Sequence, residues 1–234
     1  MKSQFAPTGT LRVAVWMVPY FARAQGDSLS GIIPDLAAAL ARAAGVEPEL
    51  VPFENPAKIV AVFRDGALDV TFVGITADRA EAIDFGPVMF EIQTTYLVPA
   101  SSAIARIEDI DRAGVRIAVP ARSAQEAHLT KIIKAATLIP VPAETPQWAI
   151  DLVQAGEADA FSHVAPMLAG VQGALPGSRI LPGSYFNVPI AIGVAKGRAP
   201  AVADFARTFA AHAKQTGIVR DAIARAGVTG LASL

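Results

Sequence analysis

DVTFVGITADR, residues 69–79, is the stretch that decides the fold. Its first seven residues form a near-continuous apolar run, which is typical of a strand buried on both faces of a parallel sheet. Thr76 is a good helix N-cap, and Asp78 and Arg79 then fall in the first turn of the helix that it begins. The stretch therefore predicts a strand followed by a helix, with Arg79 just past the C-terminal edge of a sheet.

Strand-like and helix-like stretches alternate on both sides of this segment, from residue 11 to the C-terminus. We expect strands at 11–16, 48–53, 86–99, 116–120, 138–141, 158–164 and 189–196. We expect helices at 34–45, 56–66, 124–136, 146–155, 200–214 and 217–226. This order predicts an α/β protein with largely parallel sheets. No sequence repeat and no low-complexity linker is present, so two similar α/β blocks are expected to form lobes joined by crossing strands, with a hinge between them.

The composition narrows the class of function. With 234 residues, 53% of them hydrophobic, the chain has material for one large core or two medium ones. A formal net charge of -1 gives no basic surface for nucleic acid or an anionic membrane, so small solutes or protein partners are favoured. The absence of cysteine excludes thiol nucleophiles, disulfides and thiolate metal sites. No apolar stretch reaches the roughly 18 residues of a membrane span. The first 13 residues lack the features of a signal peptide, so we expect a cytoplasmic protein or a mature exported one.

Arg79 is the first candidate for binding chemistry. Ligands of open α/β sheets tend to bind at the carboxyl ends of strands, where Arg79 is expected to lie. Its guanidinium offers two parallel N–H donors that fit a carboxylate, and Thr76 and the backbone near Gly74 are placed to complete the site. The alternative is an exposed helix arginine that pairs with Glu81 or Asp84.

The second block carries a similar feature after its first strand. Ser123 and Glu126 match a capping box, which marks a helix N-terminus, and helix N-termini attract anions. Arg122 adds a positive charge beside it. A cap that only stabilises a helix and an arginine in a solvated loop are the structural alternatives.

Aromatic side chains near the same strand ends are candidates for contacts with an apolar part of a ligand. They are Trp16, Tyr20, Phe21, Phe53 and Trp148. For each of them a place in the hydrophobic core is the alternative, and that alternative is preferred for all of them except Trp148.

The sequence shows no signature of an enzyme or of a metal site. His128, His163 and His212 are scattered without the spacing of metal ligands, and we expect no metal and no cofactor. Nucleophile-elbow, Walker and dinucleotide-binding motifs are absent.

Several motifs, taken in order, resemble those of the family 3 solute-binding proteins, the polar amino acid receptors of ABC importers. Pro19-Tyr20-Phe21 is similar to an aromatic Pro-Pro-Phe element, and residues 31–36 are similar to Gly-Phe-Asp-Val-Asp-Leu. The most specific match is Gly74-Ile75-Thr76-Ala77-Asp78-Arg79-Ala80 followed by Ile83-Asp84-Phe85. Residues 66–70, 115–125 and 156–160 also match in order, so the resemblance covers nearly the whole chain.

The resemblance implies a two-lobed periplasmic binding protein-like fold of type II, with two α/β lobes joined by two hinge strands. Lobe 1 would comprise residues 1–90 and 189–234, and lobe 2 residues 91–188. The family match assigns the carboxylate of the ligand to Arg79, with help from Thr76, Gly74 and Ser123. It also implies a ligand in the cleft between the lobes, an ABC transporter permease as partner, a periplasmic location and, we expect, a monomer.

One position departs from the family pattern. The aspartate that binds the ammonium group of an amino acid would fall at Val164. An ammonium group buried against Val164 would lose a charge-assisted hydrogen bond worth roughly 1.5 to 3 kcal/mol. His163 is a poor replacement for a carboxylate, and Arg122 replaces a glycine and adds a second cation. The ligand is therefore expected to be a carboxylate without an α-ammonium, or one whose ammonium meets Glu54, Glu91 or Glu144.

Two other functions share this scaffold. The chain also resembles cyclohexadienyl dehydratase, which eliminates water and carbon dioxide from a prephenate-like acid, and Glu144 or Glu91 would then be the candidate acid. The remaining alternative is a ligand-sensing domain of a signalling receptor. A binding protein without catalytic residues is the favoured interpretation.

Overall fold

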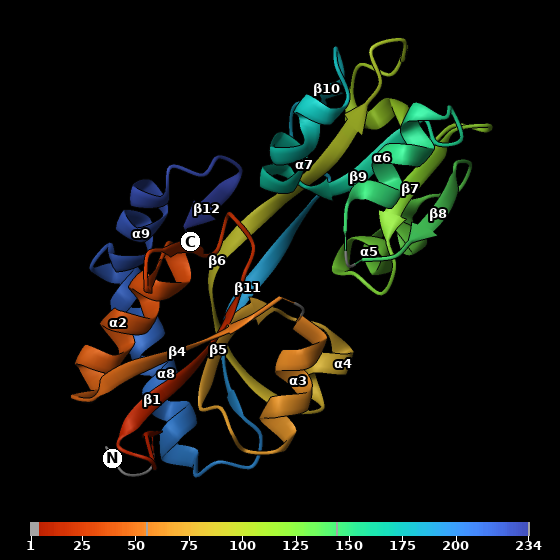
Figure 1. Cartoon of the computed structure of the whole chain (residues 1–234). Helices are drawn as coiled ribbons and strands as arrows, with labels where there is room; N and C mark the ends of the chain where they lie inside the picture. The colour runs from red at the N-terminus through yellow and green to blue at the C-terminus, as the bar shows by residue number, and fades with distance from the viewer. Residues whose placement is uncertain (1–4, 55, 144, 234) are drawn as a thin grey trace. The chain divides into compact units, whose positions relative to one another are not determined.

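The computed structural model describes residues 5–54, 56–143 and 145–233, and these residues form an α/β fold of two compact units. Unit 1 comprises Met1–Glu91 and Pro189–Leu234, and unit 2 comprises Ile92–Val188. Both boundaries fall inside strands, namely β6 (Ile83–Val98) and β11 (Phe186–Ala195). The chain therefore passes from one unit to the other through two strands (Figure 1).

Unit 1 is built on a sheet in the order β4-β1-β5-β11-β6. Strands β1 (Thr10–Trp16), β4 (Glu47–Phe53) and β5 (Val70–Gly74) are parallel, whereas β11 runs antiparallel to β5. All five residues of β5 are buried, as the apolar run at 69–75 predicts. The prediction of parallel strands is confirmed within this sheet.

The helices of unit 1 lie on both sides of its strands (Figure 1). The helix α3 (Pro56–Arg64) lies on one side and packs Ile59 and Phe63 against Ala14 and Val73 of the sheet. On the other side lie α2 (Ile32–Ala44), α8 (Pro200–Gln215) and α9 (Ile218–Ala226). The remaining elements of the unit are the hairpin β2 (Arg23–Gln25) and β3 (Ser28–Ser30), the short helix α4 (Ala77–Ala80) and β12 (Leu231–Ser233).

Unit 2 repeats this plan with the sheet order β6-β9-β7-β8. Strands β7 (Arg116–Pro120), β8 (Thr137–Val141) and β9 (Ala160–Val164) are parallel, and β6 pairs with β9 in the antiparallel sense. Side chains of the strands alternate between two cores. One faces α6 (Gln147–Gln154) and α7 (Ala165–Val171), and the other faces α5 (Ala124–Ile132). Shorter elements are η1 (Ile107–Asp109), η2 (Gln172–Ala174) and β10 (Arg179–Ile180).

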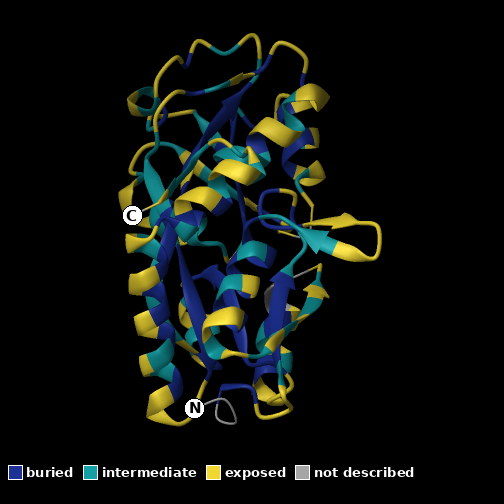
Figure 2. Cartoon of the chain, turned by 90° about the vertical axis from the view of Figure 1, so that its left-hand side faces the viewer, coloured by how far each residue is buried: buried dark blue, intermediate teal, exposed yellow. Residues whose placement is uncertain are grey.

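Burial follows the layers in both units. The strands are mostly buried, and the helices expose one face while the other packs on the sheet (Figure 2). Among the residues that the structure describes, three large apolar side chains are more than a third exposed, namely Ile75, Ile132 and Trp148. Within the described ranges, no helix has both the length and the apolar character needed to cross a bilayer.

Each unit contains an ion-pair clamp of the same kind among its described residues. In unit 1, Asp69 accepts hydrogen bonds from the backbone N–H, Nε and Nη2 of Arg12 at 2.9, 3.0 and 2.9 Å. In unit 2, Asp159 accepts the equivalent bonds from Arg116 at 2.8, 3.0 and 3.0 Å. Both arginines also donate to a glycine carbonyl oxygen, that of Gly66 or Gly156. Each clamp joins a parallel strand, β1 or β7, to the turn before a neighbouring parallel strand, β5 or β9.

Burial distinguishes the two clamps. The Asp69 side chain is 0% exposed and receives a further hydrogen bond from Arg198 at 2.9 Å, whereas the Asp159 side chain is 36% exposed. Burial acts to raise the pKa of Asp69, but the hydrogen bonds from Arg12 and Arg198 outweigh it and hold the pKa below its usual value.

One predicted helix is shorter than the sequence indicates. The helix expected at 124–136 ends at Ile132, and Ile133 is extended. The cause is Asp111, whose carboxylate accepts the backbone N–H groups of Lys134, Ala135 and Ala136. These three bonds replace the helical ones and lower the pKa of Asp111. The prediction for 133–136 is therefore wrong.

Candidate functional site: two strand edges with unpaired arginines

Arg79 lies where the sequence predicts it, in α4 directly after β5. Thr76 is the N-cap of this helix, and its hydroxyl accepts the backbone N–H of Arg79 at 3.4 Å. The Arg79 Nη1 atom donates to the carbonyl oxygen of Gly74, the last residue of β5, at 2.7 Å. This bond holds the Arg79 guanidinium at the C-terminal end of β5.

The rest of the Arg79 guanidinium is available to a ligand. No described acidic side chain forms an ion pair with it, so the predicted alternatives Glu81 and Asp84 are not its partners, and Glu81 pairs with Arg64 instead. In the described part of the chain, every fully buried side-chain N or O atom has a hydrogen-bond partner. The Nε and Nη2 atoms of this partly buried residue have no partner among the described residues, so neither atom is fully buried. Burial lowers the pKa of Arg79, which nevertheless stays charged at neutral pH.

Among the aromatic candidates, Tyr20 is the one that interacts electrostatically with Arg79 in the described structure. It is 5% exposed, burial raises its pKa, and it interacts electrostatically with Arg79. Phe21 is only 1% exposed and lies in the core, where its ring meets Tyr20 at a centroid distance of 4.8 Å. Trp16 and Phe53 are neighbours across β1 and β4, are partly buried, and pack against the core below α3.

Ser123 and Arg122 lie at the corresponding edge of unit 2, between β7 and α5. The Ser123 hydroxyl accepts the backbone N–H of Glu126 at 3.1 Å, which confirms the predicted helix cap. The reciprocal bond runs from the backbone N–H of Arg122 to the Glu126 carboxylate. The Arg122 guanidinium is exposed and has no described acidic partner. Arg122 also has a φ of 56°, the only positive φ among the described non-glycine residues.

His163 and Val164 end β9, which runs parallel to β7, so both strands bring their carboxyl ends to the same edge of the sheet. Val164 is buried and is the N-cap of α7. His163 is partly buried, and its Nδ1 atom accepts the backbone N–H of Val164 at 2.8 Å. Burial lowers the pKa of His163 to about 4, so the imidazole is neutral at pH 7.

Two tyrosines near this edge, Tyr96 and Tyr185, were not singled out in the sequence. The Tyr185 hydroxyl hydrogen-bonds to Ser162 at 2.6 Å, and the Tyr185 ring stacks on Tyr96 at 4.7 Å. His128, predicted to be structural, stacks on Phe186 at 4.4 Å. No sequence signal links these residues, because they come together only through the pairing of β6, β9 and the segment before β11.

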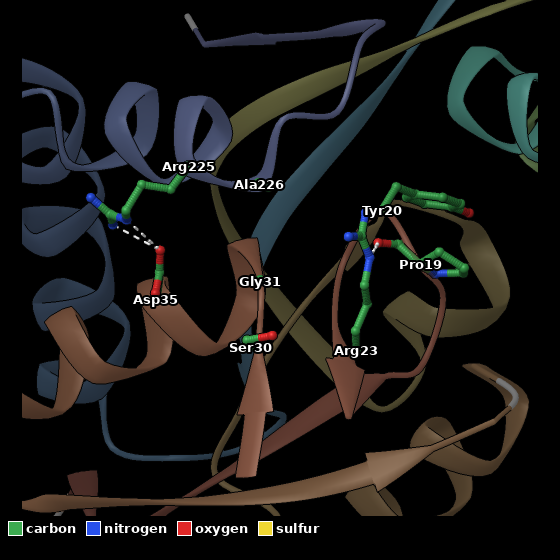
Figure 3. Close-up of a pocket in the computed structure, with 8 residues that line it drawn as sticks. All are labelled: Pro19, Tyr20, Arg23, Ser30, Gly31, Asp35, Arg225 and Ala226. Atoms are coloured by element: carbon green, nitrogen blue, oxygen red, sulfur yellow. Dashed lines mark hydrogen bonds and ion pairs between the residues drawn. The ribbon is translucent and has the colours of Figure 1, made fainter. Parts of the chain in front are cut away.

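A pocket of about 240 Å³ lies in unit 1, and of the predicted ligand-binding residues only Tyr20 lines it (Figure 3). An ion pair between Asp35 and Arg225 at 2.8 Å forms one wall. The Arg23 side chain stands apart from this pair and donates to the Pro19 carbonyl oxygen. The described residues contain no group of three His, Asp or Glu side chains placed to hold a metal ion. Of the three acids considered as ammonium partners, Glu144 lies outside the described residues.

Two α/β units linked by strands, with candidate binding residues at the carboxyl ends of parallel strands, define the class of type II periplasmic binding proteins. Residues 11–224 match the bacterial extracellular solute-binding proteins, family 3, and the chain belongs to this family.

Solved structures agree with this class. An ancestral amino acid-binding protein described as a precursor of cyclohexadienyl dehydratase has a TM-score of 0.73 at 24% identity, covering 96% of this chain and 97% of that one. An amino acid ABC transporter substrate-binding protein from Streptococcus pneumoniae, bound to L-arginine, has a TM-score of 0.71 at 20% identity, with 95% and 96% covered. An ancestral arginine-binding protein bound to arginine has a TM-score of 0.71 at 25% identity, with 93% and 97% covered. A search of curated protein sequences gives no match.

Proposed function

We propose that this protein binds a small carboxylate and delivers it to the permease of an ABC importer on the outer side of the cytoplasmic membrane. Membership of the extracellular solute-binding family supports the transport role. The observation that carries the carboxylate assignment is Arg79, a partly buried guanidinium with two unbonded N–H-bearing atoms and no described acidic partner. In unit 1, Thr76 and Gly74 form hydrogen bonds with Arg79 and Tyr20 interacts with it electrostatically. The family resemblance also implies a role for Ser123, and Val164 stands where the family has its ammonium-binding aspartate.

A thermal-shift screen of organic acids and amino acids, followed by titration calorimetry of the hits, tests this function. The protein should first be unfolded, dialysed and refolded to remove ligand carried through purification. Carboxylates are expected to raise the melting temperature by mass action, and their uncharged amides are not. If no carboxylate among the acids and amino acids binds, the proposal is wrong.

A change at Val164 tests the proposal that this position disfavours a plain α-amino acid. Val164→Asp places a carboxylate at the end of β9, where an ammonium group gains a charge-assisted hydrogen bond worth roughly 1.5 to 3 kcal/mol. We expect the affinity for L-α-amino acids to rise by about 10-fold or more in calorimetry. Val164→Asn is the matched control, because it adds a similar side chain without the charge. Equal gains for both variants, or no gain for either, would contradict the assignment.

Catalysis of the cyclohexadienyl dehydratase type has less support. The matched family consists of solute-binding proteins, and of the two candidate acids Glu144 lies outside the described residues. Incubating the purified protein with prephenate and following product absorbance separates the two functions, since a binding protein leaves prephenate unchanged.

A further inference from the structure

We infer that the Tyr20 hydroxyl donates a hydrogen bond to the acid group that Arg79 binds, an inference that rests on the carboxylate-binding function proposed above. Tyr20 would then select the ligand through its hydroxyl and not only through the apolar face of its ring. Both residues belong to unit 1. Three features of this unit support the role: a hydroxyl without a partner, a ring held in place, and a neighbouring guanidinium with unused N–H donors.

The Tyr20 hydroxyl has no hydrogen-bond partner among the described residues. Tyr20 is only 5% exposed, and every fully buried side-chain N or O atom in the described part of the chain is hydrogen-bonded. The hydroxyl therefore holds part of the small exposed area of this residue, where a bound molecule can reach it. A nearly buried hydroxyl without a partner destabilises the folded chain, and a ligand oxygen would supply the missing bond.

Aromatic contacts hold the Tyr20 ring in place. Its centroid lies 4.8 Å from that of Phe21 in an edge-to-face arrangement, and Phe21 in turn meets Trp16 at 5.8 Å. Figure 3 shows the Tyr20 ring directed away from the ion pair of Asp35 and Arg225. Packing alone does not require the hydroxyl, because a phenylalanine would make the same ring contacts.

Tyr20 and Arg79 follow two neighbouring strands of one sheet. Strand β1, which precedes Tyr20, pairs in parallel with β5, which precedes Arg79, so both strands bring their carboxyl ends to the same edge. Arg79 interacts electrostatically with Tyr20 more strongly than with Asp78, its neighbour in α4. The hydroxyl and the guanidinium are therefore close to each other, yet no hydrogen bond joins them in the described structure.

Both groups are hydrogen-bond donors at neutral pH. A guanidinium has donors only, and burial raises the pKa of Tyr20, so its phenol keeps the proton. A carboxylate has two oxygens with lone pairs for several hydrogen bonds, so it can accept from the guanidinium and from the phenol at once. A carboxamide offers one oxygen, and its NH₂ group would face further donors. Tyr20 therefore adds to the preference of this site for an acid over its amide.

Tyr20→Phe removes the hydroxyl and keeps the ring, and titration calorimetry measures the affinity that is lost. The probes are butyrate, 2-oxobutyrate and L-arginine, together with any other carboxylate that stabilises the wild type in the screen described above. We expect the affinity for each bound carboxylate to fall at least about 10-fold, because a hydrogen bond to a charged group disappears. An affinity within threefold of the wild-type value would overturn the inference and leave the carboxylate-binding function standing. A wild type that binds no carboxylate would overturn both.

Tyr185→Phe is the matched control for stability, because the Tyr185 hydroxyl is already bonded to Ser162 at 2.6 Å. Its removal should lower the melting temperature of the ligand-free protein by about 2 to 4 °C. Tyr20→Phe should leave the melting temperature unchanged or raise it, since no bond within the protein is lost. An equal fall in both variants would show that the Tyr20 hydroxyl has a partner in the protein, and the inference would be wrong.

Fluorine NMR of protein labelled with 3-fluorotyrosine observes the contact directly. The chain has three tyrosines, and the signal of Tyr20 is the one that Tyr20→Phe lacks. We expect this signal to shift when the most tightly bound of the carboxylate probes is added to saturation. A Tyr20 signal that stays within its linewidth would overturn the inference.

Discussion

Replacing Arg79 by methionine is expected to abolish carboxylate binding and to leave the ligand-free fold at least as stable as before. The loss in affinity should be about 100-fold or more, because two charge-assisted hydrogen bonds disappear together. The ligand-free protein loses no ion pair, since no described acid faces this guanidinium. It also no longer bears the cost of holding a charge in a partly buried place. Calorimetry and thermal denaturation measure the two effects separately.

Arg64→Met is the matched control for this variant. Arg64 is 56% exposed and pairs with Glu81, two residues after Arg79 in the sequence. The substitution therefore removes another arginine of unit 1. We expect both affinity and melting temperature to stay near the wild-type values. If Arg79→Met destabilises the ligand-free protein by several kcal/mol, Arg79 has a structural partner and the proposed role is wrong.

Asp69→Asn is expected to have the largest effect on stability, lowering the free energy of unfolding by about 3 to 5 kcal/mol. The substitution keeps the shape of the side chain but leaves Arg12 and Arg198, with side chains 17% and 20% exposed, facing a neutral amide. Asp159→Asn makes the same change in the exposed clamp of unit 2, where the loss should be a small fraction of this. Denaturant titration of both variants measures the difference, and equal losses would show that burial does not set the strength of the clamps.

The loss of stability at acid pH should depend on the same clamp. The folded-state pKa of Asp69 lies below its ordinary value, so its contribution is complete at neutral pH. The unfolded chain takes up the proton first as the pH falls, and the contribution is lost as the pH drops further through the folded-state pKa. Wild-type stability should therefore decline steeply below about pH 4, near the ordinary pKa of an aspartate, and Asp69→Asn should flatten this decline. Parallel curves for the two proteins would contradict the assignment.

The local sequence pattern was sufficient to predict most strands and the position of Arg79. The apolar run at 69–75 and the cap at Thr76 are consecutive in sequence, and their structure depends on neighbours only a few residues away. The early end of α5 was not predictable, because it depends on Asp111, which binds residues 23 to 25 positions further along the chain.

Contacts between distant residues account for the other omissions. The wall of the pocket in unit 1 joins Asp35 to Arg225, 190 positions apart, and nothing in either local sequence indicates the pair. The two clamps were not predicted from the sequence either, although each has an arginine in a strand and a Gly-x-x-Asp segment downstream. Outside these few residues the sequences of the two units differ, so pairing in three dimensions reveals a repeat that sequence comparison within the chain does not.

The interrupted course of unit 1 has a consequence for biosynthesis. Unit 2 is a single continuous segment, Ile92–Val188, whereas unit 1 needs residues from both ends of the chain. The clamp of Asp69 is complete only after Arg198, 129 positions later in the chain, has been synthesised. We therefore expect unit 2 to acquire protection from proteolysis on ribosome-bound chains before unit 1, whose central strand β5 stays unpaired on one side until β11 has emerged. During that interval the nascent chain would present an open apolar strand edge, the kind of surface that chaperones recognise.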